Sequence, residues 1–157
     1  MKYALPLIAS IVALGACSSP SNDTPITAAN LPLMCQQQEW QLVSMTSNGS
    51  DRALSAETRS TPSFSCDEKT RVVGMASINR YFGDLEVGAD GKLNWPGPGF
   101  ASTMMAGPPE LMDQERDYFA TLTQTSQASV KGDVLILSNS DNSQQLHFSL
   151  NHPKPAG

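Results

Sequence analysis

Three cysteines carry the most reactive side chains of this 157-residue chain, and the first, Cys17, lies in a recognisable processing site. The run Leu14-Gly15-Ala16-Cys17 follows an apolar stretch at residues 5–14 and one basic residue, Lys2. This pattern is typical of an export signal that ends in a lipobox, where small residues let the processing enzyme close around the chain. The sequence therefore predicts that the Cys17 thiol takes a diacylglycerol as a thioether. An ordinary secretory signal with a chance cysteine is the alternative.

The predicted lipid anchor divides the chain into four parts. Residues 1–16 are the signal peptide, and residues 17–34 are expected to form a lipid-anchored flexible tether, because they are mostly polar and bury little surface. Residues 35–150 are expected to form one folded domain, and residues 151–157 a disordered tail. Several acyl chains anchor a protein stably to a membrane. Because Ser18 rather than an aspartate follows the cysteine, we expect the outer membrane, with the domain facing the periplasm.

Charge and missing motifs exclude several function classes. Removal of residues 1–16 leaves nine basic and fifteen acidic residues, a net charge of −6. Such a domain repels phosphate backbones, so we expect no nucleic-acid partner. The two histidines, His147 and His152, are too few and too isolated for a metal site. The sequence also carries no motif of nucleotide-binding loops, serine hydrolases or zinc proteases. We therefore expect neither enzymatic activity nor a cofactor.

The two remaining cysteines, Cys35 and Cys66, are an even number in an oxidising compartment, which favours a disulfide between them. Such a bond would close a loop of about 31 residues and stabilise the domain by about 3–4 kcal/mol in the chain-entropy model. It would join the segment before the first strand to the second strand. Two unpaired thiols are the alternative.

Hydrophobic periodicity predicts seven or eight short strands and one helix. The expected strands cover residues 40–45, 62–66, 69–75, 82–87, 92–95, 127–131, 134–137 and 144–150, and residues 50–61 are expected to be a loop. The helix is expected over residues 109–123, with Pro109 in its first turn. Its apolar stripe comprises Leu111, Met112, Tyr118, Phe119 and Leu122. Because one stripe must cover one sheet face, the predicted fold is α+β, an antiparallel sheet or half-barrel curled around the helix.

Glu115 places a carboxylate inside the apolar stripe, between Leu111 and Phe119. An unpaired buried carboxylate would cost several kcal/mol. We therefore expect the loop at Asn79 and Arg80 to satisfy it, through backbone N–H groups or the Arg80 guanidinium. A role as general acid is the alternative, but no second carboxylate, histidine or nucleophile is placed to work with it.

Two blocks of sequence resemble the META domain, the family of HslJ-like envelope lipoproteins. The first contains Gly74, Asn79, Arg80 and Gly83, and the second contains Thr103 and leads into the helix that carries Glu115. The resemblance covers residues 40–150 and implies a half-barrel fold, with these six residues as a structural motif. Two cysteines of the family pattern fall on Ile78 and Gly107, and their joint absence fits a lost pair rather than a lost catalytic thiol. The resemblance also implies a role in envelope maintenance or stress tolerance through protein interaction.

Methionine and aromatic residues gather around the two blocks, and they leave a second function class open. Core packing is one interpretation of this content. The other is an apolar opening that binds an acyl chain or an apolar peptide, as in a carrier or a pilot-like lipoprotein of an outer-membrane assembly. The residues concerned are Met75, Met104, Met105, Met112, Tyr81, Phe82, Trp95 and Phe100. A deep cavity lined by them would favour the carrier, and a filled core would favour the interaction domain.

Overall fold

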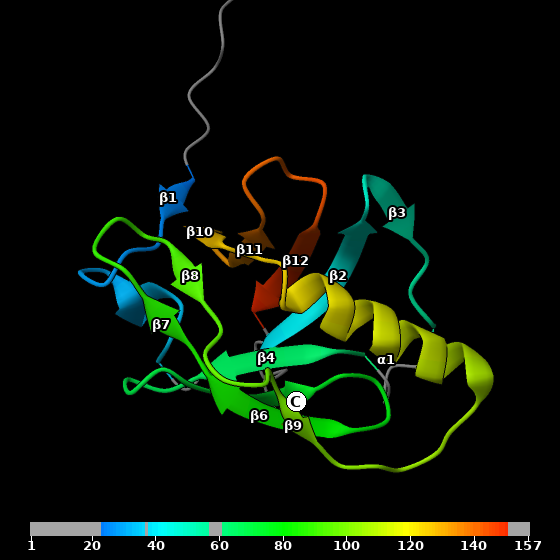
Figure 1. Ribbon diagram of the computed structural model, residues 1–157. Helices are drawn as coiled ribbons and strands as arrows, with labels where there is room; N and C mark the ends of the chain where they lie inside the picture. Colours follow the sequence, from blue (N-terminus) through cyan, green and yellow to red (C-terminus); the bar gives the residue numbers. More distant parts are fainter. Residues whose placement is uncertain (1–22, 37, 57–60, 151–157) are drawn as a thin grey trace, which may run out of the picture.

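An open antiparallel sheet of ten strands dominates the computed structural model, which describes residues 23–36, 38–56 and 61–150 (Figure 1). The strand order is β1-β10-β11-β12-β2-β4-β5-β6-β9, and β3 pairs with β2 beside this path. A separate ribbon joins β7 and β8. The strands are β1 (Thr24–Pro25), β2 (Trp40–Ser47), β3 (Ser50–Arg52), β4 (Ser63–Cys66), β5 (Arg71–Met75), β6 (Arg80–Asp84), β7 (Glu86–Val87), β8 (Leu93–Asn94), β9 (Ala101–Ser102), β10 (Gln127–Lys131), β11 (Val134–Ser138) and β12 (Gln145–Leu150).

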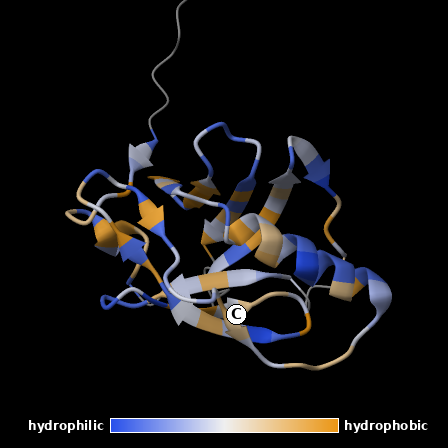
Figure 2. Ribbon diagram, viewed as in Figure 1, coloured by the Kyte–Doolittle hydropathy of each residue, from blue (hydrophilic) through white to orange (hydrophobic). Residues whose placement is uncertain are grey.

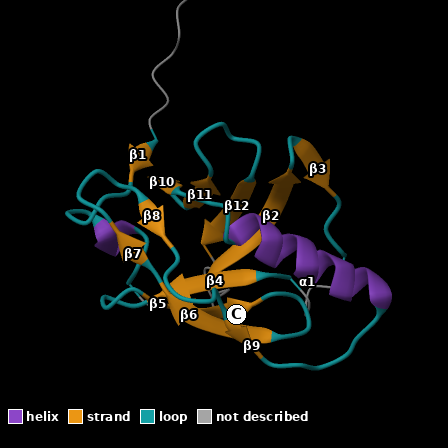
Figure 3. Ribbon diagram, in the orientation of Figure 1, coloured by secondary structure: helices purple, strands orange, loops and turns teal. Residues whose placement is uncertain are grey.

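One α-helix, α1 (Pro109–Leu122), lies against this sheet and contacts β2 and β12 (Figure 3). A proline opens its first turn, where the missing N–H is not needed, and Glu110 lies near the positive end of the helix dipole. The helix ends where Thr123 donates its backbone N–H to the Phe119 carbonyl. The predicted class, α+β with one helix on an antiparallel sheet, is therefore confirmed.

Large buried side chains form the core between helix and sheet. Hydrophobic residues occur along α1 and along the strands that face it (Figure 2). Phe148 of β12 packs against Phe64 of β4 and Tyr118 of α1, with ring centroids 5.9 and 6.5 Å apart. Trp40 is 1% exposed, and its indole N–H donates to the Met34 carbonyl at 3.0 Å. The side chains on this face of the strands alternate with outward-facing ones, as a half-buried sheet requires.

The expected tether at residues 17–34 is wrong from Thr24 onward. Strand β1 pairs with β10, a short 3-10 helix, η1, spans Leu31–Leu33, and Ile26 and Met34 are 1% and 0% exposed. Ile26 and Met34 are enough to hold this segment on the domain, because both side chains are buried in the core. The low average hydropathy of residues 24–34 therefore does not prevent the segment from folding. Cys17, residues 1–16, His152 and the tail at 151–157 lie outside the described residues.

The described part of the chain contains twelve strands in place of the seven or eight expected, mainly because short strands escape a periodicity test. Strand β3 occupies part of the expected loop at residues 50–61, and the left-handed backbone of Asn48 and Gly49 turns β2 into it. The expected strand at residues 82–87 is divided between β6 and β7, and buried Leu85 lies between them. Strand β9, only two residues long, was not predicted. No helix in the described residues is long and apolar enough to cross a membrane.

Candidate functional site

Glu115 is the centre of the most connected polar cluster, although it is only 7% exposed. Its Oε2 accepts hydrogen bonds from the backbone N–H groups of Ile78 at 3.1 Å and Asn79 at 2.8 Å. Its Oε1 accepts from the Asn79 side-chain amide at 2.7 Å. Of the two arrangements considered from the sequence, the structure therefore contains the one with backbone donors. The Arg80 side chain is exposed to solvent instead.

Asn79 continues this cluster toward the segment that follows β9. Its Oδ1 accepts from the Met105 backbone N–H at 2.7 Å and from the Thr103 hydroxyl at 2.8 Å. Its Nδ2 donates to the Met105 carbonyl at 3.1 Å. The Asn79 carboxamide thus makes the two bonds to Met105 that a strand neighbour would make. Thr103 in turn accepts from the Arg80 backbone N–H at 3.2 Å.

A second polar side chain on the buried face of α1, Gln114, was missed by the sequence analysis. Its Nε2 donates to the Ser77 hydroxyl at 2.7 Å, and its Oε1 accepts from the Ser55 backbone N–H at 2.7 Å. Gln114 follows Leu111 by three residues and precedes Tyr118 by four, so its place in the stripe was readable. Two adjacent polar residues of the helix therefore fix the 76–80 loop to α1.

The two motif glycines allow aromatic rings to approach the sheet closely. A Cβ on Gly74 would collide with the Ser63 carbonyl and with the Tyr81 ring, and one on Gly83 would lie 2.7 Å from the Phe100 ring. The Tyr81 hydroxyl lies 2.7 Å from the Tyr118 hydroxyl and donates to the Ser63 carbonyl at 2.9 Å. Burial raises the pKa of both tyrosines well above their usual value. These phenols are therefore neutral structural groups at ordinary pH.

The positions of the absent family cysteines, Ile78 and Gly107, are neighbours in space. A Cβ on Gly107 would lie 2.7 Å from both Cγ1 and Cδ1 of Ile78. The Ile78 side chain therefore fills the space that a side chain at residue 107 would occupy. This contact connects the 76–80 loop to the segment before α1, which is what a cross-link at these positions would do.

Cys35 and Cys66 are joined by a disulfide, with their Cα atoms 4.6 Å apart. Both residues are buried, at 0% and 1% exposure. The bond attaches the N-terminal segment, just after η1, to the end of β4. It closes a loop of 31 residues, so the chain-entropy gain of about 3–4 kcal/mol applies.

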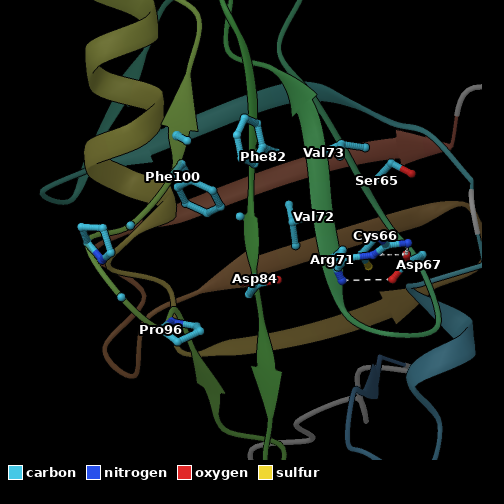
Figure 4. A pocket seen from close by; sticks show the side chains of 15 residues that line it. Ser65, Cys66, Asp67, Arg71, Val72, Val73, Phe82, Asp84, Pro96 and Phe100 are labelled. Atoms are coloured by element: carbon cyan, nitrogen blue, oxygen red, sulfur yellow. Dashed lines mark hydrogen bonds and ion pairs between the residues drawn. The ribbon is translucent and has the colours of Figure 1, made fainter.

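An open groove of about 970 Å³ lies along β5 and β6, beside the segment that leads into β9 (Figure 4). Val73 and Phe82 stand opposite each other there and are 52% and 62% exposed. The segment from Pro96 to Ala101 forms one wall. At the other wall Arg71 pairs with Asp67 at 2.6 Å, and hydrogen bonds from the Arg71 backbone and guanidinium lower the pKa of the Asp67 carboxyl.

The predicted apolar opening is not formed as one site. Phe82 and Phe100 line this groove, and Met75, Tyr81 and Phe82 line a second groove beside it along β5 and β6. The other residues of the predicted opening line neither groove: they are Met104, Met105, Met112 and Trp95. In the described residues, no cluster of three or more His, Cys, Asp or Glu is arranged to hold a metal ion. His147 is half-buried on β12, where burial lowers its pKa.

The fold and the Glu115 cluster define a small α+β domain whose best-connected polar groups hold the helix, a loop and an edge strand together. The chain belongs to the META domain family, whose model matches residues 33–152. No curated protein sequence matches the chain.

Two solved structures share the fold. The NMR structure of a protein from Burkholderia xenovorans has a TM-score of 0.66 and 22% identity, covering 95% of this chain and 100% of that one. A second NMR structure has a TM-score of 0.53 and 23% identity, covering 80% of this chain and 95% of that one. At these identities the likeness shows the fold alone.

Proposed function

We propose that this META domain protein is a non-catalytic lipoprotein of the cell envelope. The observation that carries the proposal is the lipobox that ends in Cys17 after a short apolar run. The disulfide between Cys35 and Cys66 supports it, because such bonds persist in oxidising compartments. A triacylated cysteine holds the domain at the membrane, and Ser18 directs it to the outer membrane, where the domain faces the periplasm.

The domain acts there through protein contacts, in envelope maintenance or stress tolerance. The motif residues support the non-catalytic part of the proposal, since Asn79 forms hydrogen bonds to both Glu115 and Thr103 and their polar groups serve the fold. The alternative class, a carrier or pilot-like lipoprotein with an acyl chain inside the domain, has less support. Its supposed lining is dispersed, and the space between α1 and the sheet is filled by the core.

Lipidation is tested by growing Gram-negative cells that express the full chain with a clickable fatty acid. The wild type should carry the label and pellet with outer membranes, whereas Cys17→Ser should be unlabelled. Cys35→Ser is the matched control and should keep the label. Equal labelling of wild type and Cys17→Ser, or an unlabelled wild type in the soluble fraction, would overturn the proposal. In the protein's own organism, deletion should sensitise cells to heat and detergent, and Cys17→Ser should fail to restore tolerance.

A further inference from the structure

Three strands at the margins of the large sheet differ in how their open edges are protected. Strand β1 contains Pro25, which has no N–H to offer, and it lies beside an ion pair between Asp23 and Lys131 at 3.8 Å. Strand β3 contains the charged residues Asp51 and Arg52. Prolines and charges of this kind keep sheet edges from pairing with other chains.

The edge at β9 has none of these devices. From Phe100 to Pro108 the sequence Phe-Ala-Ser-Thr-Met-Met-Ala-Gly-Pro contains no charged residue, and its proline comes after the strand. Residues 101–106 are all exposed, and β9 is the last strand of the sheet among the described residues (Figure 3). We call residues 101–105 the β9 edge segment. An exposed, uncharged edge of this kind is a template for another strand.

Hydrogen bonds within the same chain already hold the β9 edge segment in an extended conformation, without a partner strand. Thr103 donates its backbone N–H to the Arg80 carbonyl at 3.0 Å, and Met105 exchanges two hydrogen bonds with the Asn79 side chain. In an antiparallel ladder, successive residues bond to opposite sides. The backbone groups of Ser102 and Met104 therefore point away from β6, toward the open edge.

These directions match those of a second copy of the same segment. In an antiparallel pair related by a two-fold axis at Thr103, Ser102 of each copy stands opposite Met104 of the other. Both residues present an N–H and a C=O outward, so each such pair exchanges two backbone hydrogen bonds. In the same register, Met105 of one copy stands opposite Ala101 of the other.

The side chains fit this register. Ala101 is the ladder neighbour of Phe82, whose ring is 62% exposed, and its methyl group leaves that ring open. Met105, itself 54% exposed, would extend over Ala101 toward the Phe82 ring, a favourable contact for a thioether. We propose that two copies of this chain pair through their β9 edge segments and join their sheets.

Cross-linking in membranes tests the register on the full-length lipoprotein. Opposed Thr103 residues would have Cα atoms about 4.5 Å apart, which a disulfide can bridge. Thr103→Cys should therefore form a cross-linked dimer on mild oxidation, at least tenfold more than Ser102→Cys, whose Cα is offset from its own symmetry mate. Ser50→Cys, on the protected β3 edge, is the control and should not cross-link. Equal cross-linking of the three variants would overturn the proposal.

Association in solution gives an independent readout that keeps Thr103 intact. The detergent-solubilised lipoprotein should sediment as a dimer, and Met104→Lys, at a side chain that is 98% exposed, should raise the dissociation constant at least tenfold. Leu33→Lys, at a side chain 47% exposed on η1, should leave it unchanged. Added salt should strengthen the wild-type dimer, because both copies are acidic. A wild type that stays monomeric at high concentration would overturn the proposal, and in that case the edge takes a strand of another protein or none.

Discussion

At the residue scale, Glu115 shows how hydrogen bonds compensate for the burial of a carboxylate. Two backbone N–H groups and one amide satisfy its oxygens, all from residues 78 and 79. Since Asn79 also bonds to Thr103 and Met105, the Glu115 side chain and Asn79 together connect the 76–80 loop, the segment after β9 and α1. At this position of α1, hydrogen bonds to the carboxylate thus hold the helix to the loop, where an apolar side chain would do so by packing.

Replacement of Glu115 by alanine should lower the free energy of unfolding by about 2–4 kcal/mol, because it leaves the buried Asn79 N–H and the part-buried Ile78 N–H without an acceptor. For a domain of this size, the melting temperature should fall by roughly 10 °C. Thermal denaturation followed by circular dichroism measures both quantities. Glu110→Ala, an exposed carboxylate one turn earlier, should change stability by less than about 1 kcal/mol. An unchanged melting temperature for Glu115→Ala would contradict this role.

At the element scale, the contact between Ile78 and Gly107 holds the 76–80 loop against the segment that leads into α1. The same loop contains Ser77, which bonds to Gln114, so the helix is secured through side chains rather than by sheet hydrogen bonds. A larger residue at 107 would have to displace the isoleucine, and a smaller one at 78 would leave a void.

A single cysteine at residue 107 should destabilise the domain, whereas cysteines at both 78 and 107 should stabilise it again. Gly107→Cys alone should destabilise the domain by about 1–3 kcal/mol, because its Cβ meets Ile78. Ile78→Cys combined with Gly107→Cys should form a disulfide and restore about 3 kcal/mol under oxidising conditions. Melting curves and mass spectrometry without reductant measure the two effects. Free thiols in the double variant would show that the two segments are farther apart than described.

The sequence predicted the longer elements of this fold well and the short ones poorly. Helix α1 and strands β5, β10, β11 and β12 have apolar residues at a clear period, because each buries one face over five residues or more. Strands β1 and β9 have two residues each, too few for any period. Burial cost predicted that Glu115 needs a partner, and the loop at Asn79 and Arg80 was the expected one, but the sequence left backbone N–H groups and the Arg80 guanidinium as alternatives. The double role of Asn79 depends on the position of Met105, which no local pattern encodes.

At the scale of the whole molecule, the folded part of the described residues extends back to Thr24, eleven residues before the predicted boundary at Cys35. The added segment closes one end of the sheet with β1 and covers Trp40 with the carbonyl of Met34. A composition average treats Ile26, Leu31 and Met34 as isolated apolar residues in a polar stretch. Their burial depends on sites formed by β10 and β2, which only the assembled sheet provides.

A substitution in this segment distinguishes a folded part from a tether. Ile26→Ala should lower the free energy of unfolding by about 2–4 kcal/mol, because the side chain is 1% exposed. Leu33→Ala, at a side chain 47% exposed, is the matched control and should change stability by less than about 0.5 kcal/mol. Denaturant titration measures both variants. Equal and negligible effects would mean that residues 24–34 do not belong to the domain.

The disulfide at Cys35 also determines how the domain would respond to a mechanical load. A pull on the proposed lipid anchor at Cys17 would enter through β1, the two-residue strand, and would detach residues 24–34 first. The covalent link to Cys66 then transfers the force to β4, in the middle of the sheet. The eleven released residues would lengthen the connection between Cys17 and the remaining domain by about 35–40 Å. Under the proposed anchoring, the domain could thus move that much farther from the membrane while the rest of the sheet stays intact.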